Sequence, residues 1–511
     1  MKKKIKALLC AGIAGTSFML GGNASAATYH SDTDTNADVL DYIENDRRSQ
    51  RENALTDEQQ KLVQDAFEMR KNLHDPLDPT KNIPIAVEGD DLFYDQRNGD
   101  FTAKGNVKIT TLDAQRFQSD LTDGNLDVHE IKVPGKAHML QMTPGQAKII
   151  LDGYKTQYNY ETKTGKMEDV DGKVGHQYIK GKRIELYPDK IIVYDGYMTK
   201  CSAVNPDYKV TASRIEVYPN DKMICHNMKF WLGSIPVYST KKQTFKLNGK
   251  DGSQQLPRVG FNKDDGLWLS KDFSYYLTDK LSLYGFFKYT TKHAFRNHGS
   301  IIWDTGLGRF EFMNGYYAGN NHQWLKKSPS FLYTKTIKLK DFPISWGLMY
   351  ERGSWSQGNI HSMHTYYGIT MSHDPIALGG NHMLELSTNY SVTKESANHR
   401  DIKGVGYKAL VRRDVDDRWA YYALYSYTQA NSRNSVFDFD LDSYSRKFAA
   451  GFSYRWDKSN RLVVGSAFNA STHDLEDVDL YWFHDMHCYQ LIVRYRVKRR
   501  TAGVTLQFNP W

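Results

Sequence analysis

Long hydrophobic runs are almost absent from this chain of 511 residues, although 13% of its residues are aromatic. After residue 20, no stretch provides the roughly 18 unbroken apolar residues that a membrane-spanning helix needs, so no such helix is expected. The mean hydropathy is -0.63 despite 34 Tyr, 23 Phe and 10 Trp. This combination is typical of membrane β-barrels, in which apolar and polar residues alternate along each strand and cancel in any average.

Sequence motifs for energy coupling and hydrolysis are also missing. Neither a G-x-x-x-x-G-K-[ST] phosphate loop nor a G-x-S-x-G nucleophile elbow occurs. His484, His487 and Cys488 are of metal-ligand type, but on an extended strand the two imidazoles point to opposite faces, so a shared metal would need a bulge or a loop. We therefore expect no enzyme, cofactor or metal site. An outer-membrane lipase or acyl-modifying barrel, with a site assembled from distant strands, is the enzymatic alternative.

Cysteine and proline are rare, with 4 and 14 residues. Cys10 lies in the N-terminal leader, which leaves Cys201, Cys225 and Cys488 for the mature chain. In an oxidising compartment these three residues allow one disulfide and one spare thiol. A local bridge between Cys201 and Cys225 is one possibility, because the intervening 23 residues could fold into a hairpin.

The N-terminus has the parts of a secretory signal, which we assign to residues 1–26. A basic start precedes an apolar region from Ala7 to Leu20, and the ASA run at 24–26 gives a small-x-small cleavage site. The residues before Cys10 lack the small side chain expected ahead of a lipidated cysteine, so lipidation is disfavoured. The mature chain is then expected outside the cytoplasm.

Residues 27–82 form a polar and initially acidic lead that we expect to be flexible apart from one amphipathic helix. Thr56-Asp57-Glu58-Gln59 is a capping box, and apolar residues recur at helical spacing from Leu62 to Leu73 until Asp75-Pro76 ends the helix. We expect this helix to pack against the β domain that follows. Docking to a periplasmic partner is the alternative.

The stretch from Ile85 to Ile109 has the pattern of a β-hairpin. Residues alternate in character before a polar turn at 95–100, where Asn98-Gly99 can adopt positive φ, and a second alternating strand begins at Phe101. The same order of strand, turn and strand recurs at 145–174, 181–193 and 210–230. Repeats at this spacing indicate stacked hairpins that share a buried core and leave open edges. A generic antiparallel β domain without a ligand is the other interpretation.

From residue 255 the strands become longer and follow a dyad pattern. Leu283, Phe287 and Tyr289 lie on one face and Lys288 and Thr290 on the other, so one face suits lipid and the other suits water. Similar segments continue as far as the alternating strand at 504–508. About 14–16 strands are expected, since a closed bacterial barrel has an even number of strands. A soluble β-sandwich is the alternative for this part of the chain.

Short motifs in both parts resemble one family. Tyr94-Asp95 before the turn, Gly99 inside it and the run AKGNV at 103–107 resemble the OstA repeat of lipopolysaccharide-transport proteins. Further motifs, similar to the junction between periplasmic domain and barrel in the LptD/OstA family of lipopolysaccharide-assembly outer-membrane proteins, are CSA at 201–203, GSIPVY at 233–238 and PRVGF at 257–261. The resemblance covers roughly residues 83–290. Barrels of this family usually have many more strands, so the chain resembles a short-barrel variant.

The resemblance implies an all-β chain with two functional domains. Residues 83–240 would form an OstA-type periplasmic β-jelly roll, and residues 241–511 a transmembrane antiparallel β-barrel in the cell outer membrane. Such a translocon receives lipopolysaccharide from a periplasmic LptA-like bridge protein and inserts it into the outer leaflet through a laterally opening barrel. The barrel assembly machinery of the outer membrane and an LptE-like plug lipoprotein are further implied partners, and no nucleic acid is. A passive porin or structural barrel with a periplasmic β domain is the alternative.

The resemblance also implies the roles of two groups of residues. An interior slot of the jelly roll would carry acyl chains, and we assign to it Ile85, Val87, Val107, Ile109, Ile149 and Leu151. A disulfide would join Cys201 to Cys488 and fix the jelly roll to the barrel. Family members usually carry two such bridges, which three mature cysteines cannot supply.

Two further groups are predicted from physical arguments. Pro236 and Pro257 lack a backbone N–H donor, so we predict that they weaken strand pairing at a lateral gate. The alternative is that the two prolines only mark a strand end and a connector.

Arg494, Arg496 and Lys498 share one strand face, which we predict to be a basic face of the lumen, because Arg or Lys facing lipid costs roughly 2 to 4 kcal/mol at the bilayer midplane. Inward arginines can bind phosphate through two hydrogen bonds. A turn that stays in water is the alternative.

Overall fold

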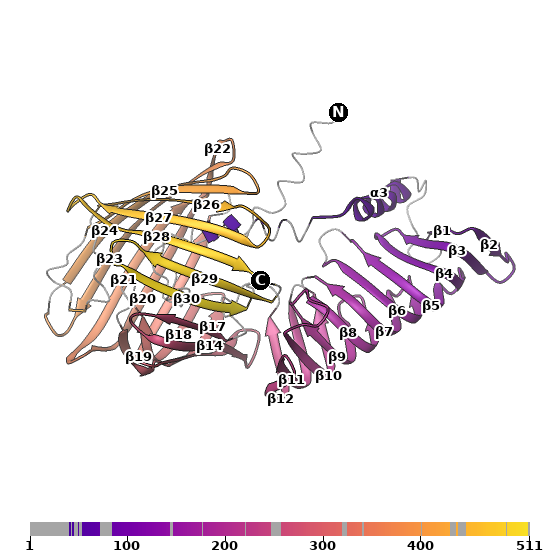
Figure 1. Ribbon diagram of the computed structural model, residues 1–511, viewed down its shortest axis with the longest axis horizontal. Coiled ribbons are helices and arrows are strands. Elements are labelled where there is room, and N and C mark those ends of the chain that lie inside the picture. The colour runs from indigo at the N-terminus through magenta and orange to yellow at the C-terminus, as the bar shows by residue number, and fades with distance from the viewer. Residues whose placement is uncertain are drawn as a thin grey trace. The chain divides into compact units, whose positions relative to one another are not determined.

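The structure is a computed structural model that describes residues 40, 41, 43, 44, 47, 50, 54–71, 84–143, 147–175, 177–219, 221–246, 257–318, 324–339, 342–399, 401–429, 436–437, 446–486 and 488–508. The chain divides into two units, Met1–Arg47 with Ser253–Pro510, and Arg48–Gly252 with the last residue (Figure 1). The second unit thus extends past the boundary predicted at residue 240. The predicted signal peptide lies outside the described residues. Within them, no helix is long and apolar enough to cross a membrane.

Helix α3 (Asp57–Lys71) precedes the sheet of the second unit. The backbone N–H of Gln59 donates to Thr56 Oγ1 at 3.3 Å, and the backbone N–H of Thr56 donates to Gln59 Oε1 at 3.1 Å, so the predicted capping box is formed. Leu62 and Ala66 are buried in one apolar cluster with Ala114, Leu140 and Met142. The helix therefore packs against the β domain, as expected.

Twelve strands form one antiparallel sheet in this unit. They are β1 (Ile85–Glu88), β2 (Asp91–Tyr94), β3 (Asp100–Thr111), β4 (Gln115–Asn125), β5 (Glu130–Gln141), β6 (Ile149–Asn159), β7 (Thr164–Val174), β8 (Gln177–Leu186), β9 (Ile191–Thr199), β10 (Tyr208–Tyr218), β11 (Lys222–Leu232) and β12 (Ile235–Lys246). From β3 onward each strand pairs with its neighbours in chain order, while β1 and β2 both pair with β3. The four predicted hairpins are present. The repeat pattern does not predict β4 or β5, because β4 is mostly polar and Pro134-Gly135 interrupts β5.

The long strands of this sheet bend near their middle. Non-glycine residues with positive φ inside these strands are Asn106, Lys155, Asp169, Asp195 and Asn227. In β11 the buried side chains are Met223 and Cys225 before the bend, but Met228 and Phe230 after it. Because side chains alternate between the two faces of a strand, this change of parity keeps one face of the bent sheet apolar along its whole length. Among the described residues, α3 packs against this unit through the cluster of Leu62 and Ala66.

The other unit contains a closed antiparallel barrel. Its strands are β13 (Arg258–Asn262), β14 (Gly266–Tyr276), β15 (Leu281–Thr290), β16 (Ala294–Phe295), β17 (His298–Thr305), β18 (Gly308–Ala318), β19 (Trp324–Lys338), β20 (Ile344–Gln357), β21 (Ile360–His373), β22 (Ile376–Gly379), β23 (His382–Glu395), β24 (Asp401–Asp414), β25 (Trp419–Thr428), β26 (Arg446–Arg455), β27 (Asn460–Asn469), β28 (Asp474–Asp485), β29 (Tyr489–Arg496) and β30 (Thr501–Phe508). The short strands β16 and β22 are side pieces, because β15 also pairs with β17 and β21 with β23, so sixteen strands make up the wall. The barrel and its strand number confirm the prediction.

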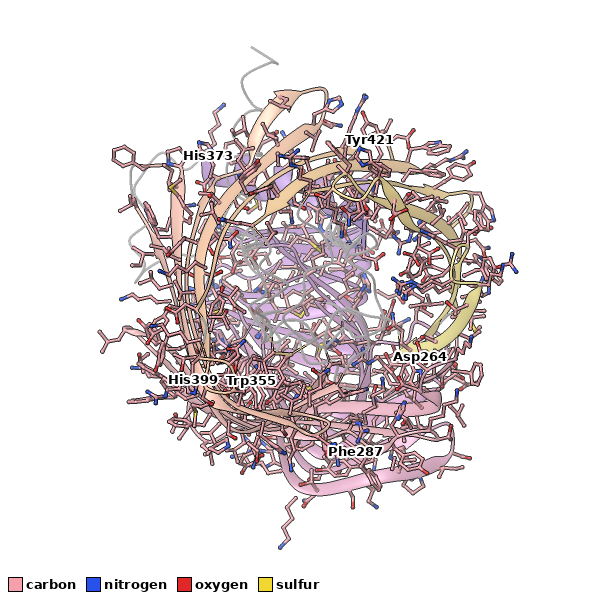
Figure 2. The ribbon with its side chains drawn as sticks, turned by 90° about the vertical axis from the view of Figure 1, so that its left-hand side faces the viewer. Asp264, Phe287, Trp355, His373, His399 and Tyr421 are labelled. Carbon is pink, nitrogen blue, oxygen red and sulfur yellow. The ribbon has the colours of Figure 1, made fainter. Side chains whose placement is uncertain are left out.

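Burial alternates along the barrel strands as the dyad pattern predicts, and side chains project from both faces of the wall (Figure 2). In β15, Leu283 and Tyr289 are exposed on the outer face, whereas Lys288 and Thr290 are buried. In β27 the buried residues include Arg461 and Val463, while their neighbours are only half-buried. The outer face is therefore mainly apolar, and the inner face carries the polar and charged side chains.

Candidate functional site

The junction between β13 and β30, which we call the seam, closes the barrel. It extends only from Val259 opposite Leu506 to Asn262 opposite Gly503. By comparison, β20 and β21 pair along their full lengths. Among the described strands of the barrel wall, the seam is the shortest junction. Every backbone group that loses its partner in lipid costs several kcal/mol, so the free energy needed to open a junction grows with its length and is lowest at the seam.

The two prolines predicted for the lateral gate lie in different places. Pro257 directly precedes β13, and the pairing of the seam stops short of it. Pro236 lies in β12 opposite Trp231. Because β12 is the last strand of the bent sheet, a residue without an N–H donor is tolerated there. Of the two predicted residues, Pro257 adjoins the seam, and Pro236 belongs to neither of its two strands.

Buried ion pairs line the inner wall next to the seam. Lys288 Nζ donates to Asp265 Oδ2 at 2.9 Å, and Arg258 Nη2 lies 3.6 Å from Asp272 Oδ1. These four side chains are at most 9% exposed. Lys288 Nζ also lies 5.1 Å from the ring centre of Trp268. The wall beside the seam thus carries charges of both signs that neutralise one another locally.

The predicted basic face meets a carboxylate that sequence reasoning did not include. Arg494 Nη2 and Arg496 Nε donate to the same Asp479 Oδ1, at 3.0 and 3.1 Å. Asp479 is 1% exposed, and the two arginine side chains are largely buried. Lys498 lies beyond the end of β29, where its backbone N–H donates to Asp477 Oδ1 at 2.8 Å. Asp477 and Asp479, two residues apart in β28 and so on one face, are the signal that could have identified these partners.

Five described residues from the start of the chain lie against the inner wall of the same unit. They are Leu40, Asp41, Ile43, Glu44 and Arg47, all helical, and their partners belong to β24–β28 and the adjoining turns. The sequence predicts a flexible lead here, and at these positions the structure corrects that prediction. The spacing of Leu40 with Ile43, and of Asp41 with Glu44 and Arg47, is a helical signal in the sequence, but it does not reveal the partner.

A second cluster of polar and aromatic side chains lies on the inner wall of β19–β23. The Trp355 and His364 rings stack at 3.5 Å between centres, and His364 is paired with Glu395. Lys327 Nζ donates to Glu351 Oε1 at 2.6 Å. The Phe437 ring, from the segment between β25 and β26, lies 5.9 Å from that of Trp355 (labelled in Figure 2). The dyad pattern predicts that such residues face inward, but not that they meet. This cluster narrows the space inside the barrel on that wall.

The residues predicted to line the interior slot lie on the apolar face of the bent sheet. Val107, Ile109, Ile149 and Leu151 are at most 5% exposed. Ile85 and Val87 are half-buried, and Val87 pairs directly with Ile109. Tyr158 on the same face donates its hydroxyl hydrogen to Gln115 Oε1 at 2.6 Å, and burial raises the pKa of this phenol above its usual range. The face is therefore mainly apolar, with a few buried polar groups such as Gln115 and the Tyr158 hydroxyl.

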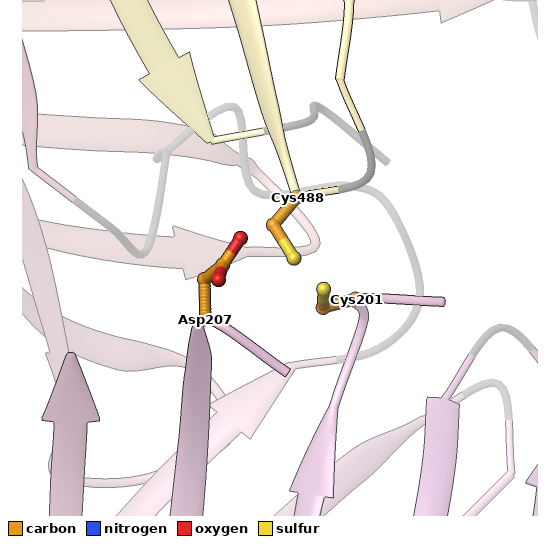
Figure 3. A group of neighbouring side chains, drawn as sticks. All are labelled: Cys201, Asp207 and Cys488. Carbon is orange, nitrogen blue, oxygen red and sulfur yellow. The ribbon is translucent and has the colours of Figure 1, made fainter. Parts of the chain in front are cut away.

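The cysteines behave as the family resemblance implies. Cys201 and Cys488, which lie side by side in Figure 3, are both disulfide-bonded, and this confirms the predicted pair. Cys225 is free and fully buried. Burial raises the pKa of the Cys225 thiol to about 12, so it is not ionised near neutral pH. The alternative bridge between Cys201 and Cys225 is excluded. Among the described residues, one group of metal-ligand types occurs, these two cysteines with Asp207, and its sulfurs are already committed to the disulfide.

Comparisons with known proteins give structural similarity only. No family model and no curated protein matches the chain. Solved structures that match include a mutant porin of Rh. blastica (8% identity, 49% of this chain and 97% of that chain, TM-score 0.29), OmpF of Salmonella typhi in complex with daunomycin (10%, 49% and 96%, TM-score 0.31) and a bacterial polysaccharide outer membrane secretin (11%, 50% and 97%, TM-score 0.30). The barrel assignment rests on the strand pairing within this chain.

Proposed function

We propose that this chain is an outer-membrane translocon of the LptD/OstA type, which receives lipopolysaccharide from a periplasmic bridge and inserts it into the outer leaflet through a laterally opening barrel. The observation that carries the proposal is the short seam between β13 and β30, which runs from Val259 to Asn262, next to the almost equally short junction of β13 with β14. A passage for small solutes needs only a lumen. An acylated molecule must also leave the barrel sideways into lipid, and a junction that opens at low cost meets that need.

The outer face of the barrel supports a location in the outer membrane. Aromatic rings on neighbouring strands follow one another across this face, with centre distances of 5.7, 6.3, 6.3 and 5.2 Å along Trp303, Phe310, Phe331, Tyr350 and Tyr367. Apolar and aromatic outer faces are typical of strands in contact with lipid. We infer that the strands span the outer membrane and that the barrel assembly machinery inserts them.

The bent sheet supplies the proposed route for acyl chains. We interpret it as a periplasmic OstA-type β-jelly roll whose interior slot is lined by residues such as Ile109 and Leu151. Each methylene group removed from water contributes about 0.8 kcal/mol, so a molecule with several long acyl chains cannot cross an aqueous compartment unprotected. The apolar face of the sheet is the surface in this chain that can provide such protection.

The start of the sheet offers an edge for the periplasmic bridge. In the described part of the chain, β1 and β2 each pair only with β3, which leaves their other sides open. On β2, Leu92 is 53% and Phe93 81% exposed. An LptA-like protein built from similar hairpins can add its own strand here through backbone hydrogen bonds.

An LptE-like plug lipoprotein has less support, because residues of this chain already lie against the inner wall of the barrel.

A passive porin with a periplasmic β domain is the second candidate function. The inner wall favours it, because the buried charges on that wall are those of a water-filled channel. A porin, however, gains nothing from a preceding sheet with a continuous apolar face. Transport of lipopolysaccharide uses both the charged inner wall of the barrel and the apolar face of the sheet.

Photo-crosslinking in living cells tests the proposed function. We expect a benzophenone amino acid in place of Val87 to capture lipopolysaccharide, because Val87 pairs with the fully buried Ile109 and so faces the interior. The same amino acid in place of the exposed Glu88 points to the opposite face and serves as the matched control. Adducts are detected by immunoblotting for lipopolysaccharide. Equal labelling at both positions, or none at Val87 in cells that grow normally, would contradict the proposal.

A further inference from the structure

The residues from the start of the chain form an amphipathic contact with the inner barrel wall. Leu40 is 0% and Ile43 3% exposed. They belong to one buried cluster with residues of five adjacent strands, Leu410, Ala420, Tyr422, Ala449, Val463, Ala467, Tyr481 and Phe483. These wall residues alternate with exposed outer-face residues such as Tyr421 and Trp482, so the cluster lies inside the barrel and not on its lipid side.

Ion pairs of complementary sign surround this apolar contact. Arg455 Nη2 donates to Glu44 Oε1 at 2.7 Å, and Arg461 donates to Asp41. In the opposite sense, Arg47 Nε donates to Asp414 Oδ1 at 2.7 Å. The acidic residues of the segment thus meet arginines of the wall, and its arginine meets an aspartate of the wall. Complementarity of this kind fixes which surface a segment binds and in which orientation.

The wall does not need the segment in order to close. The strand ladders from β24 to β28 are continuous without it. Arg461 Nε and Nη1 and Arg455 Nε are buried and have no hydrogen-bond partner among the described residues. Buried donors without acceptors are costly, so this contact is less favourable than a fully satisfied core contact. These features distinguish a docked segment that can leave from a permanent part of the barrel wall.

We infer that Leu40, Asp41, Ile43, Glu44 and Arg47 belong to a built-in plug, which reduces the open area of the lumen and has to be released before a bulky molecule can pass. The inference applies to any cargo of the barrel and does not depend on the proposed function. It also gives the acidic cluster before Arg47 a role, since Asp41 and Glu44 are the residues that hold the plug on Arg461 and Arg455. Loss of the Asp41 carboxylate removes the acceptor described for Arg461. Loss of the Glu44 carboxylate removes one acceptor of Arg455, which keeps its contacts with Asp485 and the carbonyl oxygen of Lys458. Both changes weaken the contact and favour release.

Ion conductance of the purified full chain in planar lipid bilayers tests the plug. We expect Glu44→Arg to raise the mean conductance several-fold, because two guanidinium groups then oppose each other and expel the segment. The double variant Glu44→Arg/Arg455→Glu restores an attractive pair and is expected to return the conductance towards the wild-type value. Asp264→Asn, which removes a carboxylate from the exposed turn between β13 and β14, is the matched control and should leave the conductance unchanged.

A second measurement reports on the segment itself. In an Ile43→Cys background we expect slow labelling by a water-soluble maleimide, because the side chain is buried, and fast labelling when Glu44→Gln is added. Heat-modifiable migration on gels shows in each case that the barrel is folded. Unchanged conductance together with unchanged labelling in folded variants would overturn the plug. Neither assay contains lipopolysaccharide, so their failure leaves the transport proposal intact.

Discussion

Locking the seam with a disulfide is expected to stop export of lipopolysaccharide to the cell surface. Val259 and Leu506 are direct partners in the pairing of β13 with β30, and directly opposed residues bring their Cβ atoms within about 4.5–5.5 Å. The double variant Val259→Cys/Leu506→Cys therefore suits a cross-link. Oxidised cells should lose surface lipopolysaccharide almost completely, because the cargo cannot leave the barrel sideways, and a reductant should restore it.

The neighbouring junction supplies the control for this lock. Val493 and Val504 are direct partners between β29 and β30, which stay paired in any opening at the seam. The variant Val493→Cys/Val504→Cys carries the same two thiols under the same conditions and is expected to export normally. Normal export through a seam that mass spectrometry shows to be cross-linked would refute lateral opening at β13 and β30. A loss of export in both variants would trace the defect to the added thiols.

Removal of the carboxylate of Asp479 is expected to destabilise the barrel severely. Asp479 is 1% exposed and accepts hydrogen bonds from both Arg494 and Arg496. Asp479→Asn leaves two largely buried cations without their shared counter-ion, and breaking such a pair costs about 3 to 5 kcal/mol. The free energy of unfolding, measured by urea titration in detergent with heat-modifiable migration as the readout, should fall by that order.

Two further variants test whether the lost charge of Asp479 causes the loss of stability. Asp474→Asn lies in the same strand at an exposed position and should change the free energy of unfolding by no more than about 0.5 kcal/mol. Adding Arg494→Gln and Arg496→Gln to Asp479→Asn removes the uncompensated charges and should recover much of the lost stability. If Asp479→Asn alone is as stable as the wild type, this carboxylate is not what stabilises the two arginines in the wall.

The fold follows from the sequence wherever one short-range pattern dominates. Alternation at period two predicts the hairpins of the bent sheet and the two faces of barrel strands such as β15, because only local spacing is involved. The same reasoning does not predict β4, whose sequence is mostly polar, since β4 is held by backbone pairing with β3 and β5 on both sides. It also does not predict the bends, since the residues with positive φ include Lys155, which carries no local turn signal.

The candidate site is less predictable from the sequence, because its contacts join distant parts of the chain. The seam can be expected from closure of a barrel, but its short length depends on where β13 begins after Pro257. Asp479 lies 15 residues from Arg494, and the partner of Glu44 lies 411 residues away. Charge complementarity at such separations has no periodic signal in a single sequence. Pro236 lacks the backbone donor, as predicted, but local sequence does not show that it lies in β12 and not in a strand of the seam.

Depletion of the protein with labelling of surface lipopolysaccharide tests the central claim most directly. Cells that stop producing this chain should lose newly made lipopolysaccharide from their surface and accumulate it at the inner membrane. Uptake of small solutes through the porins of the cell should continue. Re-expression of the wild-type chain should restore the label, and re-expression of the locked Val259→Cys/Leu506→Cys variant should not. Normal surface labelling after complete depletion, with reduced uptake of small solutes as the only defect, would contradict the account and leave a passive porin.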